Sequence, residues 1–273
     1  MTTQNPSNAF SEEKQRNIAL QGDDKELRLT ADDWFLKSLK YNYSYNFSAL
    51  GRPIIQYPQD MVALHEIIWD VRPDLIVECG IAHGGSLIHN ASMLAMLDYC
   101  DAVESGEMLD PLSGKRKVLG IDIDIREHNR KAIEAHPLCH KIDMIQGSSI
   151  SPEVIQQVRG YAKDFARILV ILDSNHTHDH VLAELEAYAP LTSKGSYCIV
   201  FDTVVEDLPD HMYPDRPWGK GNNPKTAVWA YLDILKANAR FGADNQPLNF
   251  EIDKDIENKL LITVAPDGFL RRL

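Results

Sequence analysis

The stretch Leu75-Ile76-Val77-Glu78-Cys79-Gly80-Ile81-Ala82-His83-Gly84-Gly85-Ser86 decides the fold. It starts as a short apolar run with β-branched residues and ends in glycines, which is typical of a buried strand that turns sharply into a helix. Glycines at such a turn let a ligand approach the backbone just before a helix N-terminus. The spacing departs from G-x-G-x-x-G because Ala82 stands at the second glycine position, so a dinucleotide site is not favoured.

Apolar runs and helical segments alternate over the rest of the chain, and this pattern predicts parallel strands joined by right-handed crossovers. The predicted strands are Leu75–Glu78, Val118–Ile123, Lys141–Gln146, Arg167–Leu172 and Ser196–Phe201, and the predicted helices between them are Ser86–Leu97, Glu127–Ala135, Pro152–Arg159 and Asp179–Ala189. A helix follows over Pro224–Ala239. Strands at Leu248–Ile252 and Lys259–Val264, joined by Asp253–Asn258, then predict an antiparallel edge hairpin. The expected fold is α/β: a doubly wound, mostly parallel, seven-stranded Rossmann-like sheet.

Residues 1–70 are expected to form a helical N-terminal extension, and residues 71–273 the core domain. Residues 1–22 are polar, and we expect the start of the chain to be loosely ordered. A helix is predicted over Thr30–Lys40 with Thr30 as its cap, followed by the aromatic stretch Tyr41–Phe47 and a helix over Asp60–Asp70. The extension either packs on the core or covers an active site, and both interpretations stay open.

Composition excludes several classes of partner. The chain of 273 residues has a formal net charge of −12, which would repel nucleic acids and anionic membranes. The four cysteines lack zinc-site spacing, which suits buried thiols in a reducing cytoplasm. Neither a signal sequence nor a membrane-spanning apolar stretch is recognisable, so we expect a soluble cytoplasmic protein. The aromatic N-terminal region is compatible with self-association, and the sequence leaves the oligomeric state open.

Polar residues follow each predicted strand, at the edge where a doubly wound sheet binds ligands. Asp122 and Asp124 end the second strand, where an acidic side chain can accept the ribose hydroxyls of an adenosine cofactor. Asp124 can alternatively cap the next helix. Ser148 and Ser149 end the third strand, where hydroxyls can reach an adenine edge.

The fourth strand ends in Asp173-Ser174-Asn175-His176-Thr177-His178-Asp179-His180, the most unusual local composition in the chain. If the fifth strand lies beside the fourth, Asp202 approaches Asp173. Two converging carboxylates either repel each other or share a cation, and oxygen ligands without a thiolate suit Mg²⁺. Solvated carboxylates on loops are the simpler alternative.

Taken together, these stretches resemble class I S-adenosylmethionine-dependent O-methyltransferases, and more narrowly the cephalosporin hydroxylase and rhamnosyl O-methyltransferase family. The resemblance runs from Tyr41 to Val264. The matching stretches are Tyr45-Asn46-Phe47, Gln56-Tyr57-Pro58-Gln59-Asp60, Glu78 to Ser86, Gly120-Ile121-Asp122-Ile123-Asp124, Gly147-Ser148-Ser149, Leu172-Asp173-Ser174 with His176, Gly195-Ser196-Tyr197, and Asp202-Thr203.

The resemblance implies a methyl donor lying across the first three strand ends. Glu78 and Gly80 would line the methionine side, with His83, Gly84 and Ser86 in the same loop, Asp122 at the ribose, Ser148 and Ser149 at the adenine, and Asp173 beside the cofactor. It also implies Mg²⁺ held by Asp173 and by a Glu-Asp pair after the fifth strand. This chain has Phe201-Asp202 there, so one carboxylate ligand is missing. Thr203, Glu206 or a water molecule would have to take its place.

The implied activity is methyl transfer to a hydroxyl of a sugar or another small polyol or natural product. His176 would be the catalytic base beside Asp173, with His178 as the reserve candidate. The stretch Tyr41–Phe47 and the loop Val204–Asn223 are candidates for the acceptor pocket. Two alternatives rank lower: an oxidoreductase, and an accessory protein that binds the cofactor without turnover, for which Phe201 is the argument.

Overall fold

The structure is a computed structural model and describes residues 6–273. Within this range a sheet of seven strands has the order β5-β4-β3-β6-β7-β9-β8. Its strands are β3 (Leu75–Cys79), β4 (Lys117–Asp122), β5 (Ile142–Gln146), β6 (Ile168–Leu172), β7 (Tyr197–Val200), β8 (Phe250–Ile252) and β9 (Phe269–Arg272). The first five in sequence run parallel, whereas β9 is antiparallel to both β7 and β8. This confirms the predicted fold class.

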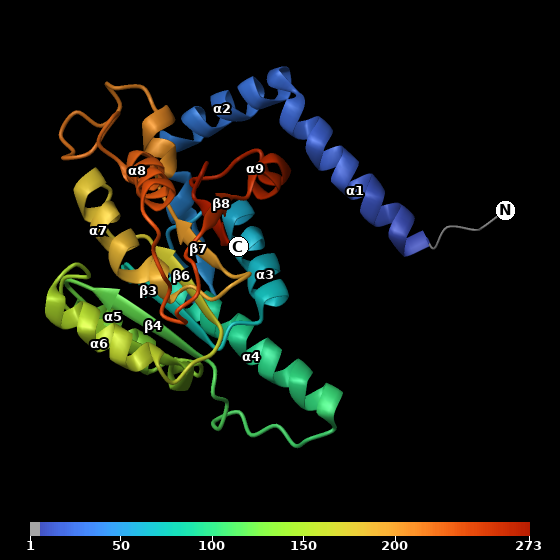
Figure 1. The fold of residues 1–273 in the computed structure, drawn as a ribbon, viewed down its shortest axis with the longest axis vertical. Coiled ribbons are helices and arrows are strands. Elements are labelled where there is room, and N and C mark those ends of the chain that lie inside the picture. Colours follow the sequence, from blue (N-terminus) through green and yellow to red (C-terminus); the bar gives the residue numbers. More distant parts are fainter. Residues whose placement is uncertain (1–5) are drawn as a thin grey trace.

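Helices cover both faces of the sheet (Figure 1). On one face lie α3 (Pro58–Val71), α4 (Gly85–Ser105) and α9 (Lys254–Leu260), and on the other lie α6 (Pro152–Ala162), α7 (His178–Tyr188) and α8 (Pro224–Ala237). Alternate strand residues enter different cores: Ile76 faces the first set of helices, and Leu75 and Val77 face the second. Strands that are buried on both faces have to be continuously apolar, which explains the runs seen in the sequence. The short helix α5 (Glu127–Glu134) follows β4.

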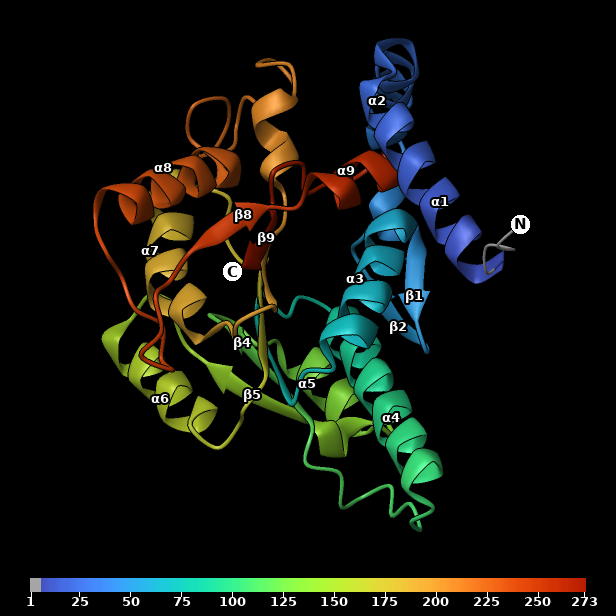
Figure 2. The same cartoon turned by 45° about the vertical axis from the view of Figure 1, so that its right-hand side comes forward.

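The N-terminal part is more helical than expected. A helix α1 spans Pro6–Asp23, so the prediction of a loosely ordered start is wrong for the described residues, while residues 1–5 lie outside them. Figure 2 shows α1 running along the outside of the molecule beside α9. Helix α2 spans Lys25–Leu39 and is capped by Asp24. Thr30 is therefore not the cap; it lies inside α2, and its hydroxyl donates to the Glu26 carbonyl at 2.9 Å.

Aromatic packing holds the parts of the N-terminal extension together. Trp34 and Phe35 of α2 pack against Tyr43 and Tyr57, with ring centroids 5.0 to 6.4 Å apart. Two short antiparallel strands, β1 (Phe47–Ala49) and β2 (Arg52–Ile54), follow the 3₁₀ turn Tyr43–Asn46. They run along α4 and bring residues of the extension to the carboxyl end of β3.

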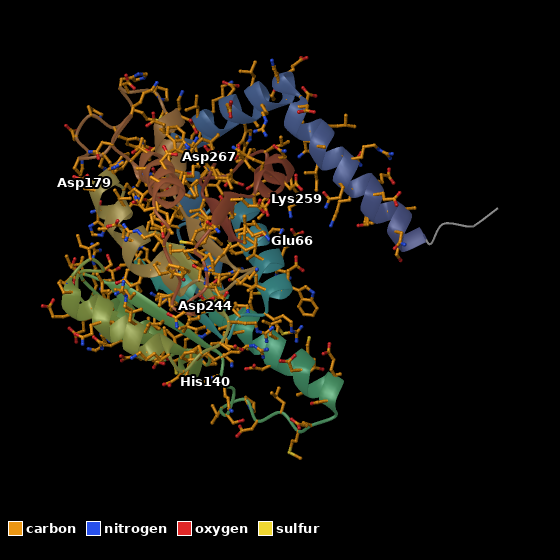
Figure 3. All side chains as sticks on the ribbon, in the orientation of Figure 1. Glu66, His140, Asp179, Asp244, Lys259 and Asp267 are labelled. Carbon is orange, nitrogen blue, oxygen red and sulfur yellow. The ribbon has the colours of Figure 1, made fainter. Side chains whose placement is uncertain are left out.

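The predicted edge hairpin exists, but its second strand was misplaced. Residues Lys254–Leu260 form α9, capped by Asp253, and the second strand is β9, not Lys259–Val264. The segment after α9 is held by the buried Asp60 of α3, which accepts hydrogen bonds from the Thr263 hydroxyl and, at 3.0 Å, from the Val264 amide. An ion pair between Lys259 and Glu66 also fastens α9 to α3 (Figure 3). The apolar composition of residues 259–264 resembles that of a strand, but these tertiary contacts hold the segment in another conformation.

The sheet reverses its order between β3 and β6, and the two strands meet at Gly80 and Asp173. The Asp173 amide donates to the Cys79 carbonyl at 2.8 Å, and Gly80 has φ +102°. A Cβ at Gly80 would overlap the carbonyl oxygen of Asp173. Only glycine therefore fits at the switch point, which is where α/β sheets bind ligands.

We predict that Gly80→Ala destabilises the protein by on the order of 3 kcal/mol, because the new Cβ adds a backbone clash to an unfavourable φ. Chemical denaturation followed by circular dichroism measures this. The matched control is Gly160→Ala on α6, where a Cβ meets no atom within 4 Å. That variant should be neutral or slightly more stable. Equal stability of the two variants would contradict the steric argument.

Candidate active site

A cleft opens at the switch point between β3 and β6. Its walls come from the loop after β3, from α4, from the carboxyl ends of β6 and β7, and from residues 53–56 of the extension. Among the predicted site residues, the lining includes Glu78, Gly80, His83, Ser86 and Asp173. Phe201 also lines it. The loop after β3 is therefore part of a concave site, as expected for a cofactor loop.

The loop is shaped by left-handed backbone and by Asp122. Ala82 has φ +45° and Gly84 has φ +81°, and Gly84 precedes the first turn of α4. One Asp122 oxygen accepts from the amides of Ile81 and Ala82 at 2.9 and 3.3 Å. Its other oxygen accepts from the Asp124 amide at 3.0 Å. Asp122 thus braces the loop, and the oxygen that accepts from Asp124 keeps a further lone pair for a ligand.

Asp124 does not cap α5. It is exposed and its carboxylate lies 3.9 Å from the Arg126 side chain, while the N-cap position of α5 is Arg126 itself and has no side-chain cap. The alternative interpretation of Asp124 is therefore wrong. His83 contributes its carbonyl, which accepts from the Arg52 guanidinium at 2.5 and 3.1 Å. Arg52 in this way ties the extension to the loop.

Glu78 is almost completely buried, with 1% exposure, at the floor of the cleft. Its carboxylate accepts from the Ser86 hydroxyl and from the Asn90 side chain, the latter at 2.7 Å. Burial raises the pKa of Glu78 from 4.5 to about 7, and these two hydrogen bonds only partly oppose that rise. Asn90 was not predicted, although Ser86 and Asn90 lie four residues apart on one face of α4, which is the signal that would have suggested it.

Asp173, His176 and Asp202 gather at the mouth of the cleft. Asp202 follows β7, which pairs with β6, so the predicted approach of the two carboxylates is observed. Donor atoms of the three residues all lie within 4.8 Å of one another. Burial and the neighbouring carboxylates of Asp202 and Glu78 raise the pKa of Asp173 well above its usual range. Such crowding of carboxylates is typical of a cation site.

The His176 imidazole is bound to Asp202, with 2.8 Å between Nε2 and Oδ2. Burial lowers the pKa of His176, but the charge and hydrogen bond of Asp202 outweigh this and leave the pKa raised. His178, the reserve candidate, begins α7 and turns away: its Nδ1 lies 2.8 Å from the Thr226 hydroxyl. Geometry thus favours His176 over His178 at the cleft.

The residues considered as substitutes for the missing carboxylate are engaged elsewhere. Phe201 is buried in the core beneath the cleft. Thr203 is fully buried and donates to the Pro266 carbonyl at 2.6 Å. Glu206 accepts from the Gly221 amide at 2.7 Å and from the Asn223 side chain, bracing the loop before α8. The third donor beside Asp173 and Asp202 is His176, which the sequence pattern did not suggest as a ligand.

Ser148 and Ser149 lie after β5, and only Ser148 is free of a buried partner. Ser149 is buried, and its hydroxyl donates to Glu184 of α7 at 2.5 Å. A direct contact of the Ser149 side chain with an adenine would compete with this bond. Ser148 is half-buried at the end of the strand.

Aromatic side chains of the loop between β7 and α8 stand over His176. The Trp218 ring centroid lies 5.3 Å from that of His176 and 5.2 Å from that of Tyr213. The Arg216 guanidinium stacks over Trp218, 5.8 Å from the ring centroid. The loop therefore presents ring faces next to the Asp–His–Asp cluster.

Comparison with known proteins shows which family this chain belongs to. Residues 41–273 match the family model described as rhamnosyl O-methyltransferase/CmcI. This chain belongs to that family. The rhamnosyl O-methyltransferase of Mycobacterium tuberculosis is 30% identical over 215 residues, which are 78% of this chain and 73% of the relative. The protein of the same name from Mycobacterium leprae is 28% identical over 233 residues, 85% of this chain and 86% of the relative.

A solved structure of CmcI with magnesium and S-adenosylmethionine shares the fold. It has a TM-score of 0.52 at 18% identity and covers 84% of this chain and 77% of that chain. The expected enzyme class, an S-adenosylmethionine-dependent O-methyltransferase, is confirmed by the family membership. Within residues 6–273, no helix is long and apolar enough to cross a membrane.

We predict that Glu78→Gln stabilises the protein at alkaline pH. Because the folded protein holds the pKa of Glu78 near 7 and the unfolded chain near 4.5, ionisation of Glu78 disfavours folding as the pH rises between these values. Gln cannot ionise, so the variant should be more stable than the wild type by up to about 3 kcal/mol at pH 8, with the gain vanishing near pH 4.5. Thermal unfolding at several pH values measures this. Glu251→Gln, exposed on β8, is the control, and a pH-independent difference would contradict the argument.

Proposed function

We propose that this chain transfers the methyl group of S-adenosylmethionine to a hydroxyl of a sugar or another small polyol, with Asp173, His176 and Asp202 activating the acceptor. The observation that carries the proposal is the gathering of these three side chains at the mouth of the cleft, in a member of this methyltransferase family. The names of the relatives, rhamnosyl O-methyltransferases, support a carbohydrate acceptor.

The cofactor would occupy the cleft along the loop after β3. Glu78 and Gly80 would face its methionine part, and the carboxylate of Glu78 suits the cationic ammonium and sulfonium groups. His83, Gly84 and Ser86 would form the wall at the start of α4, where backbone amides face the ligand. Asp122 keeps one free lone pair, on Oδ1, for a ribose hydroxyl, and Ser148 is the more available of the two serines on the adenine side.

The donor set fits a divalent cation. Asp173 and Asp202 supply carboxylate oxygens, which Mg²⁺ prefers, and Mg²⁺ completes its coordination with water or substrate. A bound metal would stabilise the alkoxide of the acceptor and so lower the pKa of its hydroxyl. The Glu of the usual Glu-Asp pair is replaced by the buried Phe201, so water or substrate would have to fill that ligand position.

His176 is suited to take the proton of the acceptor hydroxyl. When the neutral imidazole donates its Nε2 hydrogen to Asp202, Nδ1 keeps a free lone pair, and this atom would receive the proton. The acceptor oxygen then attacks the methyl carbon in line with the breaking carbon–sulfur bond, and S-adenosylhomocysteine leaves as a neutral thioether. Since the displacement needs little covalent help, the alignment of donor and acceptor supplies much of the rate.

The acceptor would lie under Trp218 and Tyr213. Trp218 packs against His176 and Tyr213 packs against Trp218, and the apolar faces of a sugar ring pack well on aromatic rings. Loops of this kind vary most among related enzymes and set specificity. The identity of the sugar is therefore a question for acceptor screening among nucleotide sugars and glycosides.

We predict that Asp173→Ala abolishes methyl transfer while S-adenosylmethionine still binds. The assay follows transfer of a labelled methyl group to an acceptor found by the screen, and calorimetry measures cofactor binding in parallel. Unchanged activity would refute the role of Asp173. Cofactor binding by the wild type without turnover on any acceptor would favour an accessory protein.

We also predict that His176→Gln lowers the turnover number by about 10²-fold or more, as expected for the loss of a general base. The matched control is His178→Gln, because His178 lies two residues away and contacts Thr226 instead of Asp202. That control should keep most of its activity. Similar losses in the two variants would argue against His176 as the base.

A further inference from the structure

Glu184 of α7 is a fully buried carboxylate that the chemistry described above does not use. Its side chain has 0% exposure and lies beneath the carboxyl ends of the strands. Moving a carboxylate out of water costs several kcal/mol, and packing alone would be served better by an apolar side chain. The reason for a carboxylate at this position therefore lies in the groups that Glu184 binds.

One oxygen of Glu184 joins two loops of the site. Oε1 accepts from the Ser149 hydroxyl at 2.5 Å and from the Ser174 hydroxyl at 2.5 Å. Ser149 belongs to the loop of residues 147–151 after β5, which we call the adenine loop. Ser174 belongs to the loop of residues 173–177 after β6, which carries Asp173 and His176 and which we call the catalytic loop.

Further contacts surround the same carboxylate. The His180 Nε2 lies 3.3 Å from Oε1 and 3.1 Å from the Ser149 hydroxyl oxygen. The Tyr188 hydroxyl, from the end of α7, donates to the Ser149 carbonyl. Burial, and after it the charge of Glu184, raise the pKa of Cys79 well above its usual range, so the carboxylate also lies close to the end of β3. Helix α7 thus contacts the loops after β5 and β6 at one polar point, close to the end of β3.

These hydrogen bonds are short, share one buried acceptor, and in the case of Ser149 are buried themselves, so they fix positions more firmly than separate surface contacts do. In a low-dielectric interior such a network is strong only when every member is in place. If Glu184 loses its charge, both hydroxyls lose a charged acceptor at once. The adenine loop and the catalytic loop then lose the charged acceptor that they share, and only the weaker contacts of His180 Nε2 with the same two hydroxyls, at 3.1 and 3.5 Å, still join them.

We propose that Glu184 is a positioning residue that holds the adenine loop and the catalytic loop in one fixed arrangement, so that cofactor affinity depends on a side chain that contacts no cofactor. The inference rests on the proposed function, because it takes the cofactor to bind across these two loops. It adds a role for Glu184, and through it for Ser174 and for the buried hydroxyl of Ser149.

The test is a calorimetric titration of S-adenosylhomocysteine into the wild type, Glu184→Gln and Glu186→Gln. Gln keeps the size of the side chain and removes the charge. Glu186 lies on the same helix but is exposed, paired with Arg240 at 3.8 Å, and serves as the matched control. We expect Glu184→Gln to bind about tenfold more weakly, as for the loss of hydrogen bonds to a charged acceptor, and Glu186→Gln to bind like the wild type. The titrations are run at a temperature at which circular dichroism shows each variant to be folded.

A second variant keeps the inference testable if Glu184→Gln does not fold. Ser174→Ala removes the bond from the catalytic loop and leaves the adenine loop unchanged in sequence. It should also weaken S-adenosylhomocysteine binding, and the double variant should bind no more weakly than Glu184→Gln alone, because the two changes break the same contact. Wild-type affinity in both folded single variants would overturn the inference, since a purely structural role lowers the melting temperature without changing affinity. Failure of the wild type to bind would instead contradict the proposed function.

Discussion

The site depends on the close contact of two strand ends, where the backbone of Gly80 passes directly against the carbonyl of Asp173. This contact lies where the strand order of the sheet reverses, and it leaves no room for a side chain. It brings the loop after β3, which lines the cleft, next to the carboxylate of Asp173. Asp202 then follows from the neighbouring strand, so the cluster of Asp173, His176 and Asp202 and the cleft share one edge of the sheet.

This edge of the sheet brings together several carboxyl groups that are buried or half-buried. Burial raises the pKa of Glu78. Burial and the neighbouring carboxylates of Asp202 and Glu78 together raise the pKa of Asp173. Glu78 is hydrogen-bonded to Ser86 and Asn90, and Asp202 to His176. Carboxyl groups with pKa values perturbed in this way cluster at functional sites.

The sheet and the strand-end carboxylates could be predicted because both follow from local patterns. Buried parallel strands are continuously apolar, and strand ends lie at the ligand edge, so Asp122, Asp173 and Asp202 could be placed at this edge from their positions, whereas the role of Glu78 came from the family resemblance. The segment Lys259–Val264 was misread because it is apolar like a strand but is held by a distant carboxylate, Asp60. The partnership of Ser149 with Glu184, 35 residues away, also depends on tertiary structure. Side-chain contacts between distant elements leave no periodic signal in one sequence.

Calorimetric titration of S-adenosylmethionine into the wild-type protein tests most directly whether the cleft at the end of β3 binds this cofactor. We expect one binding site per chain, competition between S-adenosylmethionine and S-adenosylhomocysteine for that site, and much weaker binding after Glu78→Gln. Absence of binding heat at any temperature tested, together with no displacement by S-adenosylhomocysteine, would contradict cofactor binding in this cleft.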